Sequence, residues 1–172
     1  GEGRQALQQA RLLGVAGKVD EAIAAYEKLY GGVPDDVDVA IEYWTLVARL
    51  PARHSEGVSQ LKKLNASAPG NVSLLTSLAK QMFADNKPQE GFAYLAEMAR
   101  SASGRGIAAD MWFSEVKSMP VSKASVQALQ QFLLQFPTGS VAANARVLLD
   151  QQQAQLQDPT FRARSEGLAA VK

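Results

Sequence analysis

The stretch Asp36–Pro69, DVDVAIEYWTLVARLPARHSEGVSQLKKLNASAP, decides the fold. From Val37 to Leu50 the apolar residues recur at helical spacing, and Pro51 ends the run because proline has no amide hydrogen to donate. A second amphipathic run follows, with Val58, Leu61 and Leu64 on its apolar side. Neither helix can bury its apolar stripe alone, so we expect the two to pack together and against neighbouring pairs.

The neighbouring pairs are visible in the sequence at a fixed period of 34 residues. This step aligns three sets of residues: Trp44, Leu78 and Trp112; Gly57, Gly91 and Ser125; Leu61, Leu95 and Leu129. A helix–turn–helix unit of this length is typical of the tetratricopeptide repeat. We therefore predict repeats over about residues 3–34, 37–69, 71–103 and 105–137. The second and fourth are degenerate, because Gly57 and Ser125 stand where a small alanine usually packs.

The rhythm breaks after the fourth repeat. Residues 140–157 form one longer predicted helix without a central turn, and Asp158-Pro159 then restarts a helix over 160–172. We interpret 140–157 as an unpaired helix between two runs of repeats and 160–172 as the first helix of a further repeat. The predicted fold is an all-α superhelix of antiparallel helix pairs, with a bend or hinge near Val141–Pro159. We expect self-association through the unpaired terminal helix.

Composition and charge exclude several classes of protein. The chain is 47% hydrophobic and 7% aromatic, which suits a helical array better than a compact β domain. Its 18 basic and 17 acidic residues give a net charge of +1, so no overall field argues for nucleic acid. No run approaches the roughly 20 apolar residues of a membrane span, and we expect no membrane insertion by this segment. The start carries no charged-then-apolar leader, so we expect an inner segment of a longer protein.

No constellation of residues indicates catalysis, a metal or a cofactor. Cysteine is absent, which excludes thiolate metal sites and disulfides. The single histidine, His54, lies in a predicted turn without a nucleophile motif around it. Glu42 and Asp110 lie among basic residues, which would keep them ionised as ion-pair partners rather than raise one as an acid. We predict that the segment is not an enzyme.

Three segments carry a family resemblance: EYWTLVARLPARHSEGVSQLKKLNASAPGN from Glu42, MPVSKASVQALQQFL from Met119 and DPTFRARSEGLAAV from Asp158. They resemble the periplasmic repeat region of a bacterial family, the C subunits of cellulose synthase, over about Leu12 to Val171. The resemblance implies a periplasmic tetratricopeptide array in an exopolysaccharide secretion protein anchored in the outer membrane, through which cellulose leaves.

The resemblance implies a scaffold that docks protein partners of the cellulose synthase complex and bridges the envelope to the export pore. A second interpretation is that the array guides the emerging glucan chain directly. A third is an α-superhelical arm of an envelope enzyme, such as a cell-wall lytic enzyme. The residues quoted above do not by themselves separate the three.

In repeats of this type the first helix of each pair lines the concave face. That register predicts a mostly basic groove that could dock an acidic protein segment, and its candidate residues are Arg11, Glu42, Arg49, Arg53, Lys80, Phe83, Asp110 and Lys117. The alternative is that these Lys and Arg residues are simply solvated helix formers. Sugar binding would need several aromatic platforms, and Phe83 alone falls in the groove. We expect Trp44 and Trp112 in the core, and Tyr43 as the next exposed aromatic.

Overall fold

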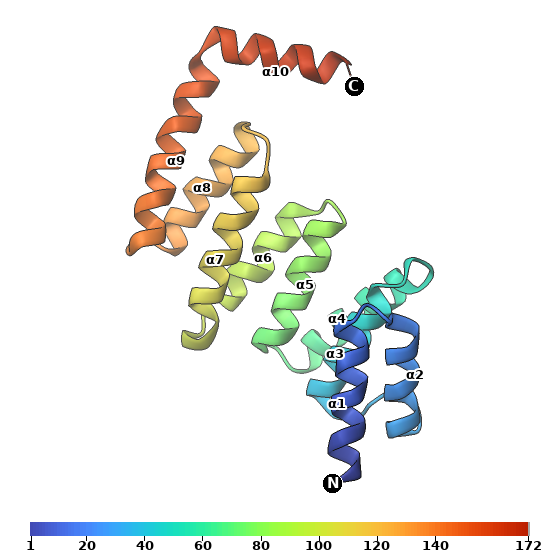
Figure 1. The fold of residues 1–172 in the computed structure, drawn as a ribbon. Coiled ribbons are helices and arrows are strands. Elements are labelled where there is room, and N and C mark those ends of the chain that lie inside the picture. The colour runs from blue at the N-terminus through green and yellow to red at the C-terminus, as the bar shows by residue number, and fades with distance from the viewer. Residues whose placement is uncertain (172) are drawn as a thin grey trace. The chain divides into compact units, whose positions relative to one another are not determined.

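The computed structural model describes residues 1–171, and side chains as far as Gly167; every regular element in that part of the chain is a helix (Figure 1). The predicted all-α architecture is confirmed. The chain divides into two compact units, the first comprising Gly1–Met98 and the second beginning at Ala99. Residue 172, the last of the predicted terminal helix, lies outside the described residues.

The first unit consists of three antiparallel helix pairs (Figure 1). Its elements are α1 (Glu2–Val15), α2 (Val19–Tyr30), α3 (Val37–Ala48), the 3₁₀ turn η1 (Pro51–Arg53), α4 (His54–Ser67), α5 (Val72–Ala84) and α6 (Pro88–Met98). Two helices have side-chain caps, since the Asp36 carboxylate accepts from the Asp38 amide and the Asn71 side chain accepts from the Leu74 amide. These caps mark where the second and third pairs begin, and Pro51 lies in the turn of the second pair.

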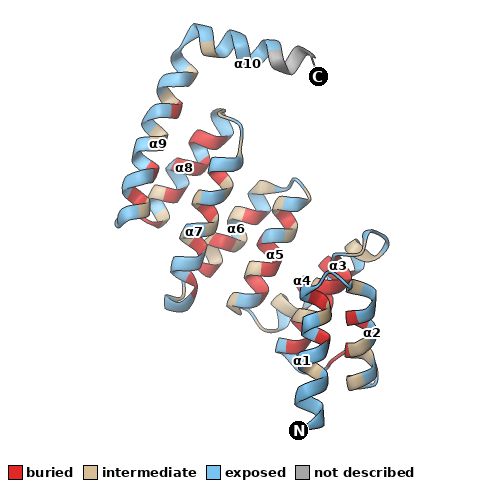
Figure 2. Ribbon diagram, in the orientation of Figure 1, coloured by how far each residue is buried: buried red, intermediate tan, exposed pale blue. Residues whose placement is uncertain are grey.

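The core of the first unit runs between the helix pairs and contains Trp44, as predicted (Figure 2). The aligned small residues lie where paired helices approach most closely. A Cβ atom on Gly57 would stand 2.5 Å from the Ala48 amide nitrogen, and one on Gly91 would stand 2.7 Å from the Phe83 ring. Glycine at these positions therefore permits a tighter contact than alanine would.

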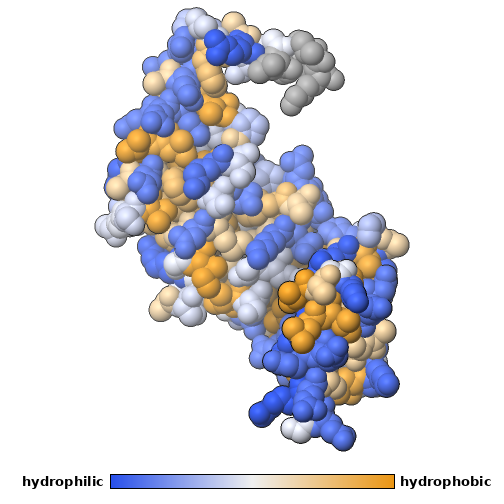
Figure 3. Space-filling view, viewed as in Figure 1, coloured by the Kyte–Doolittle hydropathy of each residue, from blue (hydrophilic) through white to orange (hydrophobic). Residues whose placement is uncertain are grey.

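An apolar area remains on the surface of the first unit. Figure 3 shows apolar side chains gathered over the C-terminal part of α1, where Leu12 is 60% exposed and Val15 is 88% exposed. Both residues belong to the first helix of a pair. This area is a feature of the exposed side of α1 and contributes nothing to the core described above.

The second unit consists of α7 (Ala102–Ser118), α8 (Lys123–Gln135), α9 (Ser140–Gln157) and α10 (Pro159–Val171). The first of these helices begins before residue 105, the predicted start of the fourth repeat. The Ser101 hydroxyl accepts from the Gly104 amide, and this cap starts α7 at Ala102. At the next helix Ser122 is the N-cap and forms a capping box with Ser125.

Helix α9 is unbroken and packs against α8 and α7. One buried hydrogen bond ties it down, from the Ser125 hydroxyl to Gln152 Oε1 at 2.6 Å. Figure 1 shows α10 turning away from the end of α9 rather than folding back along it. The described side chains of α10 are exposed except for the half-buried Phe161 (Figure 2).

Aromatic residues make the core of the second unit. The Trp112 indole nitrogen donates to the Ala128 carbonyl oxygen at 2.9 Å, and its ring lies 6.4 Å from Phe132 and 6.0 Å from Phe136. Trp112 is 4% exposed, which confirms its predicted place in the core. Burying the indole with its donor paired avoids the cost of an unsatisfied polar group.

Candidate functional site

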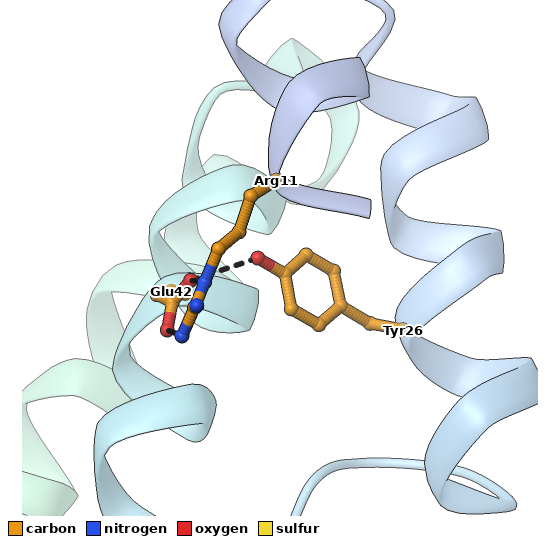
Figure 4. Close-up of polar contacts among 3 residues, drawn as sticks. All are labelled: Arg11, Tyr26 and Glu42. Carbon is orange, nitrogen blue, oxygen red and sulfur yellow. Dashed lines mark hydrogen bonds and ion pairs between the residues drawn. The ribbon is translucent and has the colours of Figure 1, made fainter. Parts of the chain in front are cut away.

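Arg11, Tyr26 and Glu42 form a polar cluster where the first helix pair meets α3 (Figure 4). Arg11 donates from Nε to Glu42 Oε1 at 2.7 Å and from Nη2 to Oε2 at 2.9 Å. The Tyr26 hydroxyl donates to the same Oε1 at 2.9 Å. Burial first, and then the Glu42 carboxylate, raise the pKa of Tyr26, so its hydroxyl remains a donor. Two predicted groove residues are thus partners of each other.

Tyr43 is buried, so its prediction as an exposed aromatic was wrong. Its side chain is 1% exposed, its ring meets Trp44 edge to face at 4.8 Å, and its hydroxyl donates to Glu27 Oε2 at 3.0 Å. Burial, followed by that hydrogen bond, raises the pKa of Tyr43. The cause is that α2, α4 and α5 all pack on α3, which leaves little of its surface free.

Arg49 and Arg53 also have partners within the first unit. Arg49 Nη1 donates to the Gly14 carbonyl oxygen at 3.1 Å, in the last turn of α1, where carbonyls lack helical partners. Arg53 makes a two-pronged ion pair with Glu56, with both hydrogen bonds at 2.9 Å. This guanidinium lowers the pKa of Glu56. Both arginines therefore hold helix ends as well as presenting charge.

Phe83 and Lys80 lie on α5 but differ in their surroundings. The Phe83 ring packs edge to face on Phe92 at 5.0 Å and covers Gly91, so it helps to join α5 to α6. Lys80 is exposed and makes no ion pair with any described residue. Phe83 is therefore used in packing, whereas the charged group of Lys80 has no ion-pair partner among the described residues.

Asp110 and Lys117 belong to the second unit. The Lys117 ammonium lies 4.9 Å from the centre of the Phe113 ring, a cation–π contact along α7. Asp110 is exposed and lines a hollow of about 300 Å³ together with Arg105, Phe136 and Ser140. The groove residues predicted from the sequence are therefore distributed over both units, six in the first and two in the second, and the groove remains a prediction.

The sequence reasoning missed the role of His54. Its Nδ1 lies 2.6 Å from the Ala48 carbonyl oxygen and its Nε2 lies 2.8 Å from Asp85 Oδ2. The hydrogen bond with Asp85 and then that with Ala48 raise the pKa of His54. His54 therefore joins the start of α4 to the end of α3 and to the end of α5. The only signal in the sequence was a histidine and an aspartate in turns of successive repeats.

The described residues contain neither a candidate metal site nor a candidate membrane span. No group of three or more His, Asp or Glu side chains among them is placed to hold a metal ion. None of the helices traced over residues 1–171 combines the length and apolarity that crossing a lipid bilayer requires.

The sequence closely matches curated proteins. No family model matches it. It is 51% identical over 170 residues to cellulose synthase operon protein C of Salmonella typhimurium (strain LT2), and 51% identical over 170 residues to that of Escherichia coli (strain K12). Each alignment covers 99% of this chain, which spans 14% and 15% of those proteins. The protein of the same name from Xanthomonas axonopodis pv. citri is 28% identical over 163 residues.

A solved structure agrees with these relatives. It is the crystal structure of the flexible tandem repeat domain of the C subunit of bacterial cellulose synthase, with a TM-score of 0.76 and 51% sequence identity. The match covers 92% of this chain and 65% of that one. Fold and sequence point to the same protein over nearly the same residues. The chain is therefore a tandem-repeat segment that belongs to the cellulose synthase operon protein C family.

Proposed function

We propose that this segment is a periplasmic scaffold of an outer-membrane cellulose export protein. In that role it docks protein partners of the cellulose synthase complex and bridges the envelope to the export pore. The observation that carries the proposal is the match to cellulose synthase operon protein C over 99% of the chain, on helix pairs of the kind that bind proteins. A cellulose-related repeat scaffold needs no catalytic group of its own.

The side chains left free on the surface support protein docking over sugar binding. Lys80 is a charged group without an ion pair among the described residues, as electrostatic steering of a partner requires. Two large aromatic rings are packed in the core and do not face solvent, since Trp44 is 8% exposed and Tyr43 is 1% exposed. Few stacking platforms are left for a neutral glucan.

One feature favours direct contact with the glucan as a second candidate function. The hollow of the second unit is lined by polar residues that include Asp110, Thr138 and Ser140, and by two phenylalanines. Those rings, Phe132 and Phe136, are 0% and 4% exposed, so they offer a sugar little apolar face. The matched relatives give no support to a lytic-enzyme arm, which we do not propose.

The experiment that tests the proposal is pairwise binding of the purified chain to each purified protein encoded in the same cellulose synthase operon. Docking predicts saturable binding of at least one of them, which Lys80→Glu weakens if the first helices carry the contact. Lys28→Glu, on the exposed side of α2, is the matched control. Arg49→Glu is unsuitable because it also removes the hydrogen bond to Gly14.

Binding of none of these proteins would contradict the scaffold proposal. A parallel titration with cellohexaose, followed by amide chemical shifts, tests the second candidate. Saturable shifts around Asp110 and Ser140 would support glucan contact. An absence of shifts at millimolar ligand, about the weakest specific binding worth considering, would count against it.

A further inference from the structure

One face of α4 forms a cleft with the turn between α5 and α6. The cleft has a volume of about 530 Å³. From α4 it takes residues at helical spacing along one face, His54, Ser55, Val58, Ser59, Lys62 and Lys63, and the wall ends at Ala66. Asp85 and Lys87 line it from the turn. The predicted groove lay on the first helices, whereas this cleft is built mainly on a second helix.

The turn holds Lys87 in a fixed place opposite α4. Asn86 has a φ of 60°, a left-handed conformation that asparagine adopts more easily than most residues. The Asn86 amide donates to the Phe83 carbonyl at 3.1 Å and the Lys87 amide donates to the Met82 carbonyl at 2.8 Å. These bonds close the end of α5, so the backbone of Lys87 is held by the helix.

His54 neutralises the negative charge of Asp85, the one carboxylate that lines the cleft. Its two ring nitrogens face the Ala48 carbonyl oxygen and the Asp85 carboxylate, which can only accept hydrogen bonds. Both nitrogens can donate at once only in the imidazolium cation, which is the form that the raised pKa of His54 favours. Asp85 is thus already paired with a positive charge from within the protein.

The lysines around the cleft then make it electropositive. Lys62 lies 3.8 Å from Glu90, a long ion pair on exposed side chains. Lys63 and Lys87 make no ion pair with any residue in the described part of the chain. The hydroxyls of Ser55 and Ser59 add hydrogen-bonding groups, and Val58 provides a small apolar surface. An occupant should therefore be anionic and able to accept hydrogen bonds.

The length of the cleft favours a peptide over a small anion. Residues 54–66 of α4 extend about 18 Å at 1.5 Å per residue, the span of about five residues of extended chain. A single phosphate would reach only part of this length and would find no arginine fork in the lining. We infer that this cleft binds an extended acidic segment of a partner protein. The inference deepens the proposed docking function, on which it rests, by naming the partner's chemistry.

The test is an amide chemical-shift titration of the whole chain with an octaglutamate peptide, and with octaglutamine as the neutral control. Saturable shifts at Ser55, Ser59, Lys63 and Lys87 are expected with octaglutamate alone. Raising the salt from about 50 to about 300 mM should weaken this binding at least about fivefold, because exposed charges are screened.

Charge reversal locates the site. The double variant Lys63→Glu/Lys87→Glu should weaken octaglutamate binding at least about tenfold. Lys28→Glu, on α2, should leave it unchanged. All three lysines are exposed, and circular dichroism confirms that each variant keeps its helices. Absent shifts, shifts confined to other surfaces, or equal weakening by Lys28→Glu would overturn the inference.

Two comparisons distinguish this inference from phosphate binding and from the scaffold proposal. Inorganic phosphate that bound the cleft as tightly as octaglutamate would overturn the assignment to a peptide. If the operon proteins bound the double variant and the natural chain equally, the cleft would not be their docking site. The scaffold proposal would not be affected by that result. Octaglutamate binding at the cleft without binding of any operon protein would support the cleft and contradict the scaffold.

Discussion

The Arg11 guanidinium and the Glu42 carboxylate meet through parallel hydrogen bonds of 2.7 and 2.9 Å across the contact between α1 and α3. Their side chains are 47% and 31% exposed, so the pair itself contributes little after screening by water. Glu42 matters more as the acceptor for the Tyr26 hydroxyl, since Tyr26 is 1% exposed. The pair joins two repeats by satisfying a buried donor.

We predict that Glu42→Ala lowers the free energy of unfolding by about 1–3 kcal/mol, because the buried Tyr26 hydroxyl loses its acceptor. Arg11→Ala should cost less than about 1 kcal/mol, as is usual for an exposed ion pair. Urea denaturation followed by circular dichroism measures both. In a Tyr26→Phe background the cost of Glu42→Ala should shrink, and an unchanged cost there would contradict this explanation.

Gly57→Ala should destabilise the chain, because the new Cβ would stand 2.5–2.8 Å from backbone and side-chain atoms of Ala48. We expect a net loss of about 1–2 kcal/mol, since overpacking outweighs the helix propensity that alanine gains. The matched control is Gly106→Ala in α7, where nothing lies within 4 Å of the new Cβ. That change should raise stability by about 0.5–1 kcal/mol. Equal thermal shifts in both variants would refute the close-contact argument.

The buried Ser125–Gln152 hydrogen bond is predicted to anchor α9 to α8. Ser125→Ala should cost about 1–3 kcal/mol, because the Gln152 amide, 3% exposed, loses its partner. The double variant Ser125→Ala/Gln152→Leu should recover part of that loss, since the Gln152 amide is then no longer left unpaired, although the Ser122 amide still lacks its Ser125 acceptor. Hydrogen exchange of the α9 amides reports the attachment directly. Unchanged protection of α9 in Ser125→Ala would show that the bond does not hold the helix.

Stability should fall as the pH rises through the pKa of His54. The hydrogen bonds to Asp85 and Ala48 raise that pKa above the ordinary 6.5, so the folded state binds the proton more tightly than the unfolded state. The stabilisation is complete below about pH 6.5 and is lost as the pH passes the raised value. Lys87, which lines the same cleft, opposes the shift without reversing it.

Thermal unfolding between about pH 6 and pH 9 measures this effect. Since the chain contains one histidine, an NMR titration of its ring gives the pKa without ambiguity. Asp85→Asn removes the largest cause of the shift and should flatten the pH dependence of the melting temperature. A His54 pKa at or below 6.5 would contradict the assignment of an imidazolium.

The helical periods and the caps could be predicted because they depend on local chemistry. Proline at 51 and the polar caps at Asp36, Asn71 and Ser122 act within a turn of the chain, and each stands at a helix boundary in the structure. The period also aligned Gly57, Gly91 and Ser125. The departure of Gly57 and Ser125 from alanine suggested degeneracy, but Gly57 admits a closer contact and Ser125 reaches Gln152.

The partners of the charged and aromatic groups could not be predicted, because they depend on which helices meet in space. The repeat register places Arg11, Arg49 and Arg53 in the predicted groove. In the structure each of them donates hydrogen bonds to a partner within the first unit. Tyr43 lies one residue from Trp44 and is buried because several helices cover α3. The cleft of α4 was missed because most of its lining, including Lys62 and Lys63, lies on a second helix, outside the register used.

The most direct test of the scaffold account is site-specific photo-crosslinking in cells that make cellulose, with the full-length protein. A photoreactive phenylalanine derivative replaces Ser59, in the cleft of α4, or Lys28, on the exposed side of α2. The account predicts crosslinks from position 59, but not from position 28, to proteins of the cellulose synthase system. Crosslinks from position 59 to glucan alone, without any protein of that system, would contradict it.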